Sequence, residues 1–487
     1  MPTVNEIIDT GFNYHQDGNL VDAENAYKQA LLMDEENSDL CNLMGVLKLQ
    51  KNEIEDAICW VEKAVKLNPS EYYFETLFQA YIRGNKFDKI VKLADEVLKK
   101  FPKNFSLLFN IAMAYKNLNN NKMAISYYDK ALKIDPTSYQ AWFNLSHIYS
   151  IEGQYKNALS ALKICKKLKP NDNDTNYFLS LAYMQTKNYD KGLKLFENRL
   201  CRETAVAIHE KTYPTLGSRE RLWHGENIKD KTILVYYEAG FGDTIMFARY
   251  LPLLKNRCKK LIFAPQKPLI PLFVESGLGV DDLIEGYIPE KMLEYDVHAP
   301  LLSLPYLLGL KGNQVFESPE GYMWANANLV EKFRKKYFDN DKFKIGIKWQ
   351  GNTYYDQERV IPVEAFEPII KRENTQVYSF QTFEGSMEVK KLEKYENVTD
   401  VTSDLIDFGQ TAAALMSLDL VICNDTSLAH LAGALGVPCC VALPYQVNWR
   451  WHDDLSKCDW YDSLKLFRQK SAGDWQSVFE EISQAIK

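Results

Sequence analysis

The sequence predicts an α-helical repeat array followed by an α/β region in two halves, each built on a parallel sheet. Three observations support this fold class. A period of about 34 residues runs through roughly the first two hundred residues, the helical period then ends, and short apolar runs alternate with helical patterns. These changes set the expected boundaries: an array over residues 1–204, a bridge over 205–230, and two α/β halves over 231–335 and 336–487.

The repeat is marked most clearly by tyrosines, small residues and prolines that recur at the same interval. Small residues let two helices approach each other closely, and a proline stops the second helix of each pair. The tyrosines are Tyr81, Tyr115, Tyr149 and Tyr183. One unit resembles the tetratricopeptide repeat pattern in full, at Trp142, Leu145, Tyr149, Ala158 and Pro170. We count about six such units over residues 3–203.

Stacked helix pairs form a curved surface that suits a peptide or a protein partner. The array is therefore predicted to recruit a substrate or a partner. Two alternatives remain open, because the array could instead support the next domain or form a homo-oligomer.

The composition is that of a globular protein. Of 487 residues, 46% are apolar and 25% are charged, and the net charge of −7 with scattered lysines does not favour nucleic acid as a partner. No apolar run reaches the roughly 18 residues of a membrane helix, and the N-terminus lacks a signal-like segment. We therefore expect a cytoplasmic protein without a membrane span. Nine cysteines without C-x-x-C spacing predict neither a zinc site nor a disulfide framework.

The α/β region is expected to contain two Rossmann-like halves in succession. Strands alternating with helices imply parallel sheets, and two such halves predict a two-lobed enzyme whose ligand lies in the cleft between them. In the first half we expect strands at residues 232–237, 260–264, 282–288 and 295–298, with a helix at 268–277. In the second half we expect strands at 343–349, 376–381 and 418–423, with helices at 362–371 and 411–417.

The junction after residue 423 is the most informative part of the chain. An apolar strand ends at Asn424, and Asp425, Thr426 and Ser427 precede a helix of small residues. These side chains are suited to capping a helix start, and a helix start at the carboxyl end of a parallel strand favours a phosphate. His430 lies on the same face of that helix. The pattern indicates a nucleotide or sugar-phosphate site, and the alternative is an ordinary strand-to-helix joint with a satisfied histidine.

A glycine loop follows the first strand of the first half. Gly240 and Gly242 could begin a dinucleotide-binding loop, but Asp243 would repel a pyrophosphate and the third glycine is missing. The loop instead offers a carboxylate at the edge of the cleft. Asp243 is suited to act as a general base for an acceptor hydroxyl, unless it only caps the helix.

Three motifs carry a resemblance to a known group. They are Glu238-x-Gly240-Phe241-Gly242-Asp243-Thr244, Trp349-Gln350-Gly351-Asn352 with Arg359, and Asp425-Thr426-Ser427-x-x-His430. Together with the repeats, they resemble bacterial tetratricopeptide proteins whose C-terminal domain is similar to the heptosyltransferases (glycosyltransferase family 9), including flagellin glycosyltransferases. The resemblance implies a GT-B fold with the acceptor on the first lobe and a nucleotide-sugar donor on the second. The last helix is expected to pack back on the first lobe.

Residue by residue, the resemblance implies that Asp243 is the catalytic base. It implies contacts to the donor phosphate and sugar from Arg359, Asn352, Asp425, Thr426, Ser427 and His430. Further candidates at the cleft are Glu238, Gly240, Gly242, Trp349, Gly351, Gln381 and Trp449, the last of which would stack on the ligand or seal the lobes together. Ala239 stands where these relatives usually have Gln, so the acceptor pocket is expected to differ.

The resulting hypothesis is an inverting glycosyltransferase that needs no metal or other cofactor and modifies a protein, flagellin-like, held by the repeats. The alternative from a different class is a non-catalytic scaffold with a degenerate GT-B domain. A third hypothesis, a chaperone-type peptide adaptor, leaves the α/β region unexplained.

Overall fold

A computed structural model of the chain describes residues 2–202, 219–286, 294–319, 321–352, 357–452 and 457–486. The chain forms two compact units, Met1–Pro170 and Asn171–Lys487. Most of the predicted bridge, residues 205–218, lies outside the described residues. In the part that is described, no helix has both the length and the apolar content needed to cross a membrane.

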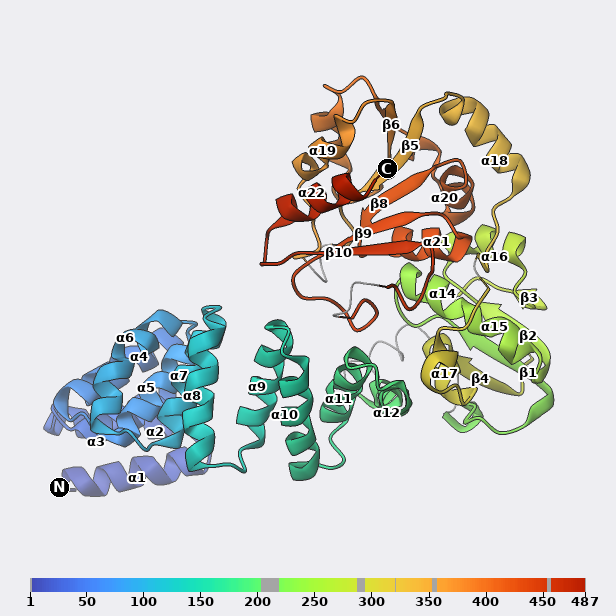
Figure 1. Cartoon of the computed structure of the whole chain (residues 1–487). Coiled ribbons are helices and arrows are strands. Elements are labelled where there is room, and N and C mark those ends of the chain that lie inside the picture. Colours follow the sequence, from blue (N-terminus) through green and yellow to red (C-terminus); the bar gives the residue numbers. More distant parts are fainter. Residues whose placement is uncertain are drawn as a thin grey trace. The chain divides into compact units, whose positions relative to one another are not determined.

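The first unit is a stack of helix pairs (Figure 1), as the repeat predicts. Its helices are α1 (Val4–Gln16), α2 (Leu20–Met33), α3 (Ser38–Gln50), α4 (Ile54–Leu67), α5 (Glu71–Arg83), α6 (Phe87–Lys100), α7 (Phe105–Asn117), α8 (Asn121–Ile134), α9 (Tyr139–Ile151) and α10 (Tyr155–Leu168). The small residues of the period pack as expected. A Cβ atom on Gly45 would come within 2.2 Å of Val61 Cγ2, so the two helices of that pair could not approach as closely with a larger residue.

A second periodic signal lies in the turns within the pairs. The residues at these turns have a left-handed backbone, which ends the first helix of each pair and suits Gly or Asn. They are Gly18, Asn52, Asn85, Asn119 and Gly153. The first helices also begin regularly, because Asn37, Ser70, Asn104 and Ser138 each accept a backbone N–H two or three residues into the helix.

The last helix pair belongs to the second unit. It comprises α11 (Asn173–Gln185) and α12 (Tyr189–Phe196) and continues into the 3₁₀ turn η1 (Glu197–Cys201). Arg199 in η1 donates to both carboxylate oxygens of Glu238, at 3.0 and 2.7 Å, in the α/β part. The division between the units therefore falls before this pair, whereas the sequence placed the end of the array at residue 204.

The second unit contains two parallel sheets with helices on their faces, as the alternating pattern predicts (Figure 1). The first is four-stranded in the order β3-β2-β1-β4, with β1 (Ile228–Tyr236), β2 (Cys258–Ala264), β3 (Asp282–Leu283) and β4 (Val297–Pro300). Its helices include α14 (Phe241–Phe247), α15 (Leu251–Lys255), α16 (Ile270–Ser276) and α17 (Leu304–Leu307). The predicted strand at 282–288 is shorter than expected, and its last two residues lie outside the described part.

The second sheet is six-stranded in the order β10-β9-β8-β5-β6-β7. Its strands are β5 (Phe343–Lys348), β6 (Thr375–Ser379), β7 (Val398–Asp400), β8 (Leu420–Asn424), β9 (Cys439–Leu443) and β10 (Leu464–Arg468). Its helices are α18 (Ala327–Phe333), α19 (Glu367–Ile370), α20 (Phe408–Leu415), α21 (Ser427–Leu435) and α22 (Trp475–Ala485), with 3₁₀ turns η8 (Val363–Phe366) and η9 (Ser386–Leu392). The predicted helix at 362–371 is thus split, because Pro368 interrupts its hydrogen bonds and a short α-helix follows a 3₁₀ turn.

The last helix corrects one expectation. Helix α22 packs against elements of the second sheet's lobe, namely α19, η8, β9 and β10, rather than back on the first lobe. The reason is its apolar face: Trp475, Phe479 and Ile482 are buried in one core with Phe366 and Ile422. That face is already covered within its own lobe.

The two sheets meet through the helices that follow β1 and β8. Helix α14 begins at Phe241, within the glycine loop, and helix α21 begins at Ser427, with two residues between it and the end of β8. The two helices pack against each other. The carboxyl ends of the two strands therefore lead to one place, and the candidate site is built there.

Candidate functional site

The helix start after β8 is not capped as the sequence predicts. Thr426 occupies the cap position with an extended backbone, but its hydroxyl makes no capping bond and lies 3.5 Å from the carbonyl oxygen of Asn424. The first N–H groups of α21 are therefore not satisfied by this side chain. An uncapped helix start with its positive dipole end favours an anion.

Arg359 and Asp425 are brought together beside this helix start. Arg359 Nη1 lies 3.2 Å from Asp425 Oδ2 and 3.2 Å from the Asp425 carbonyl oxygen. Asn424 also holds the backbone at Arg359, because its Nδ2 donates to the Arg359 carbonyl at 2.8 Å. The carboxylate thus holds the guanidinium in place rather than facing a ligand itself.

The loop after β5 approaches the same point. A Cβ atom on Gly351 would come within 2.9 Å of Thr426 Cγ2, so only glycine allows this approach without a shift of Thr426. Asn352 follows on the exposed side of the loop. Three residues predicted to bind the donor, Arg359, Asp425 and Thr426, and the further cleft candidate Gly351 are therefore neighbours.

His430 is buried at the centre of the site. Its Nδ1 lies 3.1 Å from the Tyr461 hydroxyl, and its ring stacks on Trp451 with 5.2 Å between centroids. Burial holds the pKa of His430 well below its usual 6.5, and the nearby guanidinium groups of Arg450, Arg249 and Arg359 lower it further. The imidazole is therefore neutral at physiological pH and suited to hydrogen bonding rather than to pairing with a phosphate as a cation.

Gly242 joins the first lobe to this histidine. A Cβ atom at Gly242 would lie 2.7 Å from His430 Cδ2 and 3.3 Å from the Cα of Ser427. The glycine is required because the first lobe's loop contacts the second lobe's helix at this residue. The two motifs that the sequence singled out independently are in contact.

Asp243 forms an ion pair across the lobes. Its Oδ1 accepts from Arg450 Nη2, and Arg450 Nη1 also donates to Asn448 Oδ1 at 2.8 Å. The guanidinium lies over the Trp449 ring, 4.8 Å from its centroid. The predicted base is therefore present at the meeting point of the lobes, held by a cation to which the sequence analysis assigned no role.

Several candidates stabilise loops instead of facing this point. Glu238 forms the ion pair with Arg199 and accepts from the backbone N–H of Leu302 at 3.0 Å. Gln381 is 1% exposed, accepts from the backbone N–H groups of Trp349 and Gln350, and donates to three carbonyl groups. Trp449 is buried against Trp460, so it seals the interior. Gly240 is exposed at the start of the loop.

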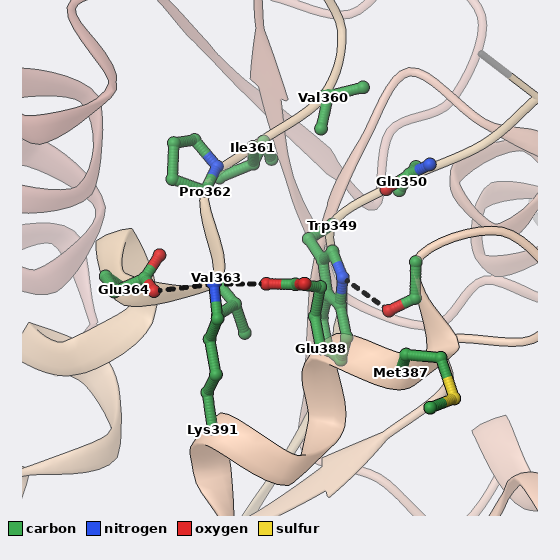
Figure 2. Close-up of a pocket in the computed structure, with 11 residues that line it drawn as sticks. Trp349, Gln350, Val360, Ile361, Pro362, Val363, Glu364, Met387, Glu388 and Lys391 are labelled. Atoms are coloured by element: carbon green, nitrogen blue, oxygen red, sulfur yellow. Dashed lines mark hydrogen bonds and ion pairs between the residues drawn. The ribbon is translucent and has the colours of Figure 1, made fainter.

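A hollow of about 440 Å³ opens beside the donor-side residues (Figure 2). It lies where the loop after β5 and the segment that follows Arg359 meet η9. One side is apolar, from Val360 to Val363, and the Trp349 indole N–H points to the Gly385 carbonyl at 3.2 Å. Lys391 lies at the rim between Glu364 and Glu388 and pairs with both. The volume of the hollow fits a ring-sized part of a small ligand.

The site also contains residues that are not among the predicted site residues, although Arg450, Trp451 and Tyr461 belong to the sequence motifs Trp449-Arg450-Trp451 and Trp460-Tyr461. Arg450 and Trp451 are in the segment after β9, and Tyr461 lies against Gly433 of α21, where a Cβ atom would meet the ring at 2.4 Å. Lys348 ends β5 and donates to the Phe380 carbonyl at 3.2 Å, and burial lowers the pKa of Lys348 to about 8. The aromatic run around residue 450 was a visible signal, but only the fold shows which of its members face the cleft.

The described residues contain no group of three or more His, Cys, Asp and Glu side chains placed to hold a metal ion. Whether the chain acts without a metal stays a prediction.

Comparisons with known proteins identify the repeats. The tetratricopeptide repeat family matches residues 105–138 and 127–160. The chain is also similar to the protein FlbA of Caulobacter vibrioides, with 21% identity over 296 residues. The alignment covers 54% of this chain and about half (48%) of that relative's length. The first unit is accordingly an array of tetratricopeptide repeats.

Solved structures similar to this chain are likewise repeat proteins. A tetratricopeptide repeat protein from Parabacteroides merdae is 17% identical, with a TM-score of 0.37 over 41% of this chain and 79% of that one. YrrB, described as a repeat protein with an unusual peptide-binding site, is 20% identical, with a TM-score of 0.33 over 38% of this chain and 97% of that one.

Proposed function

We propose that the chain is an inverting, metal-independent glycosyltransferase of GT-B architecture that modifies a protein held by its repeats. The observation that carries this proposal is the contact between the two sequence motifs at Gly242 and His430. That contact puts one carboxylate, Asp243, and one guanidinium, Arg359, on either side of an uncapped helix start.

The proposed chemistry follows from these charges. The donor phosphate binds at the start of α21 with Arg359 beside it, where a fixed cation and N–H groups stabilise the charge that develops as the sugar–phosphate bond breaks. Asp243 takes the proton from the acceptor hydroxyl as its oxygen attacks the anomeric carbon. The nucleoside part of the donor occupies the hollow beside Val360.

The repeats supply the acceptor in this proposal. Half-buried Lys116 on α7 supports a protein partner with acidic side chains, because the only hydrogen-bond partner of its ammonium group among the described residues is Asn144 Oδ1, at 3.4 Å. Burial lowers the pKa of Lys116, so a carboxylate from a partner would restore the stability of its charged form. A flagellin-like protein is the acceptor that the sequence resemblance favours.

A second candidate is a scaffold in which the repeats act and the α/β part no longer catalyses. The ion pair between Asp243 and Arg450 favours it, because the carboxylate is already engaged and would have to release Arg450 to reach an acceptor hydroxyl. Against it, the guanidinium groups of Arg450, Arg249 and Arg359 all lie near His430, an arrangement of positive charge that favours an anionic ligand there.

Thermal unfolding of the full chain with a panel of nucleotides and nucleotide-sugars tests the proposal. A nucleotide at a hundred times its Kd should add about 2.7 kcal/mol of apparent stability. The added stability should fall to about 0.9 kcal/mol in Arg359→Ala, as expected for a roughly thirtyfold rise in Kd. It should be kept in Arg334→Ala, whose guanidinium pairs with Glu331 on the outer helix α18. A panel without any shift would favour the scaffold.

A further inference from the structure

Tyr189 on α12 is joined to the candidate site through a single buried contact. Its hydroxyl is hydrogen-bonded to Nε2 of His452, and both residues are almost fully buried, at 3% exposure each. Burial raises the pKa of Tyr189 far above its usual 10, so the phenol keeps its proton and can donate it to the imidazole. The Tyr189 ring is also fixed edge-on against Phe316, 4.9 Å between centroids.

His452 has a backbone conformation that needs such support. Its φ of +52° is in the left-handed region, which costs a branched or bulky residue free energy unless its surroundings hold it there. A second contact from the same helix pair lies beside it. Lys187, in the turn before α12, pairs with Asp459 at 2.9 Å, and Asp459 Oδ2 lies 3.7 Å from His452 Nε2.

The two residues before His452 are the ones that touch the site. Trp451 stacks on His430, and Arg450 pairs with Asp243. Consecutive residues thus connect the last helix pair to the neutral histidine and to the carboxylate at the cleft. Displacement of His452 would move both neighbours, because one bend in the backbone orients all three side chains.

We propose that the last helix pair is a positioning element of the site rather than part of the partner-binding surface. Tyr189 of this helix pair and His452 are the positioning residues. Their contact holds the backbone bend at His452, which directs Arg450 to Asp243 and Trp451 to His430. The role of Asp243 as base rests on the proposed function, but the mechanical link does not. By sequence the pair is the sixth repeat, and by contacts it belongs to the α/β unit.

Hydrogen–deuterium exchange of the full chain tests the link without any substrate. Tyr189→Phe removes only the hydroxyl, and Tyr177→Phe on α11, whose ring stacks on Phe196, is the matched control. Amides in residues 445–452 should exchange about tenfold faster in Tyr189→Phe than in the control, the effect of one lost buried hydrogen bond. Amides in 240–247 should also exchange faster. Unchanged exchange in either segment would overturn the proposal.

The route through Arg450 needs its own test. If Tyr189 acts through Arg450, adding Tyr189→Phe to Arg450→Ala should leave exchange in residues 240–247 as it is in Arg450→Ala alone. Additive effects would show that the link does not run through Arg450 and would overturn this residue's part in the proposal. The nucleotide panel is read on the same variants: failure to bind any nucleotide would remove the proposed function, while the exchange data would still decide the link.

Discussion

The strand-to-helix junctions after β1 and β8 each contain an ion pair between an aspartate and an arginine, but the two pairs differ in which partner is the more exposed. After β1, Asp243 pairs with Arg450 from the other lobe, and the Asp243 side chain is the more accessible partner, 22% against 14%. After β8, Asp425 pairs with Arg359 from its own lobe, and Arg359 is the more accessible, 33% against 10%. The carboxylate is therefore the more exposed partner at one junction, and the guanidinium is the more exposed partner at the other.

This difference separates two chemical roles that the sequence could not distinguish. A carboxylate at the surface of the cleft is able to accept a proton, whereas one buried behind an arginine only orients that arginine. The pairs also differ mechanically. The pair between lobes breaks if the lobes separate, while the pair within the second lobe does not depend on the first.

The largest effect is expected from Asp243→Asn, which keeps the shape and removes the charge. If Asp243 is the base, turnover of an identified donor and acceptor should fall about a thousandfold while the nucleotide-induced thermal shift remains. Asp230→Asn, at an exposed position of the same strand β1, is the control and should have full activity. Turnover that survives in Asp243→Asn would make the two junctions equivalent and refute the assignment.

A smaller effect is expected from Arg359→Ala on nucleotide binding. Loss of a charge-assisted contact to phosphate should raise the Kd roughly thirtyfold, about 2 kcal/mol, by calorimetry. Arg450→Ala should change the same Kd by no more than about twofold, because Arg450 pairs with Asp243. Equal losses in the two variants would contradict the division of roles between the pairs.

For the free energy of unfolding, Arg450→Ala should have a larger effect than Arg359→Ala, the reverse of their order for the Kd. Arg450→Ala breaks a part-buried pair between lobes and should lower the free energy of unfolding of the second unit by about 1–2 kcal/mol in urea. Arg359→Ala removes a more exposed pair and should cost less than about 1 kcal/mol. A larger loss for Arg359→Ala would show that the pair within the lobe is the structural one.

The weakest effect is a pH dependence from His430, which lies between the two pairs. Its pKa is depressed in the folded state, so the unfolded chain takes up a proton first as the pH falls below 6.5. Stability from the neutral buried imidazole is therefore complete above pH 6.5 and declines below it. His430→Gln should show a shallower decline of Tm between pH 7 and pH 5 than the wild type. An equal decline in both would mean that the ring is not held neutral.

Much of the fold could be read from residue patterns. The recurring tyrosines and small residues predict the helix pairs, since each pair must bury the same face against its neighbours. The apolar runs at β1, β5 and β8 predict buried parallel strands. The short, half-exposed β7 was not predicted, because Val398–Asp400 carries too little apolar signal to stand out.

The candidate site was only partly readable. Asp243, Asp425 and His430 were found because each stands next to a break between strand and helix, where side chains meet ligands. Glu238 follows the same rule, yet it is used in a buried pair with Arg199, a residue of the last helix pair. The role of Arg450 could not be predicted from its neighbours in the chain, since its importance comes from Asp243, more than two hundred residues earlier.

By itself the sequence determined the repeat array, the two parallel sheets and the ionisable groups at both junctions. These features depend on local periodicity and on residues that are near each other in the chain. Only the tertiary structure decided which arginine holds which aspartate, that α22 stays on its own lobe, and that the last helix pair packs with the site. Those outcomes depend on contacts between distant segments, whose energy is set by burial and charge in three dimensions rather than by spacing along the sequence.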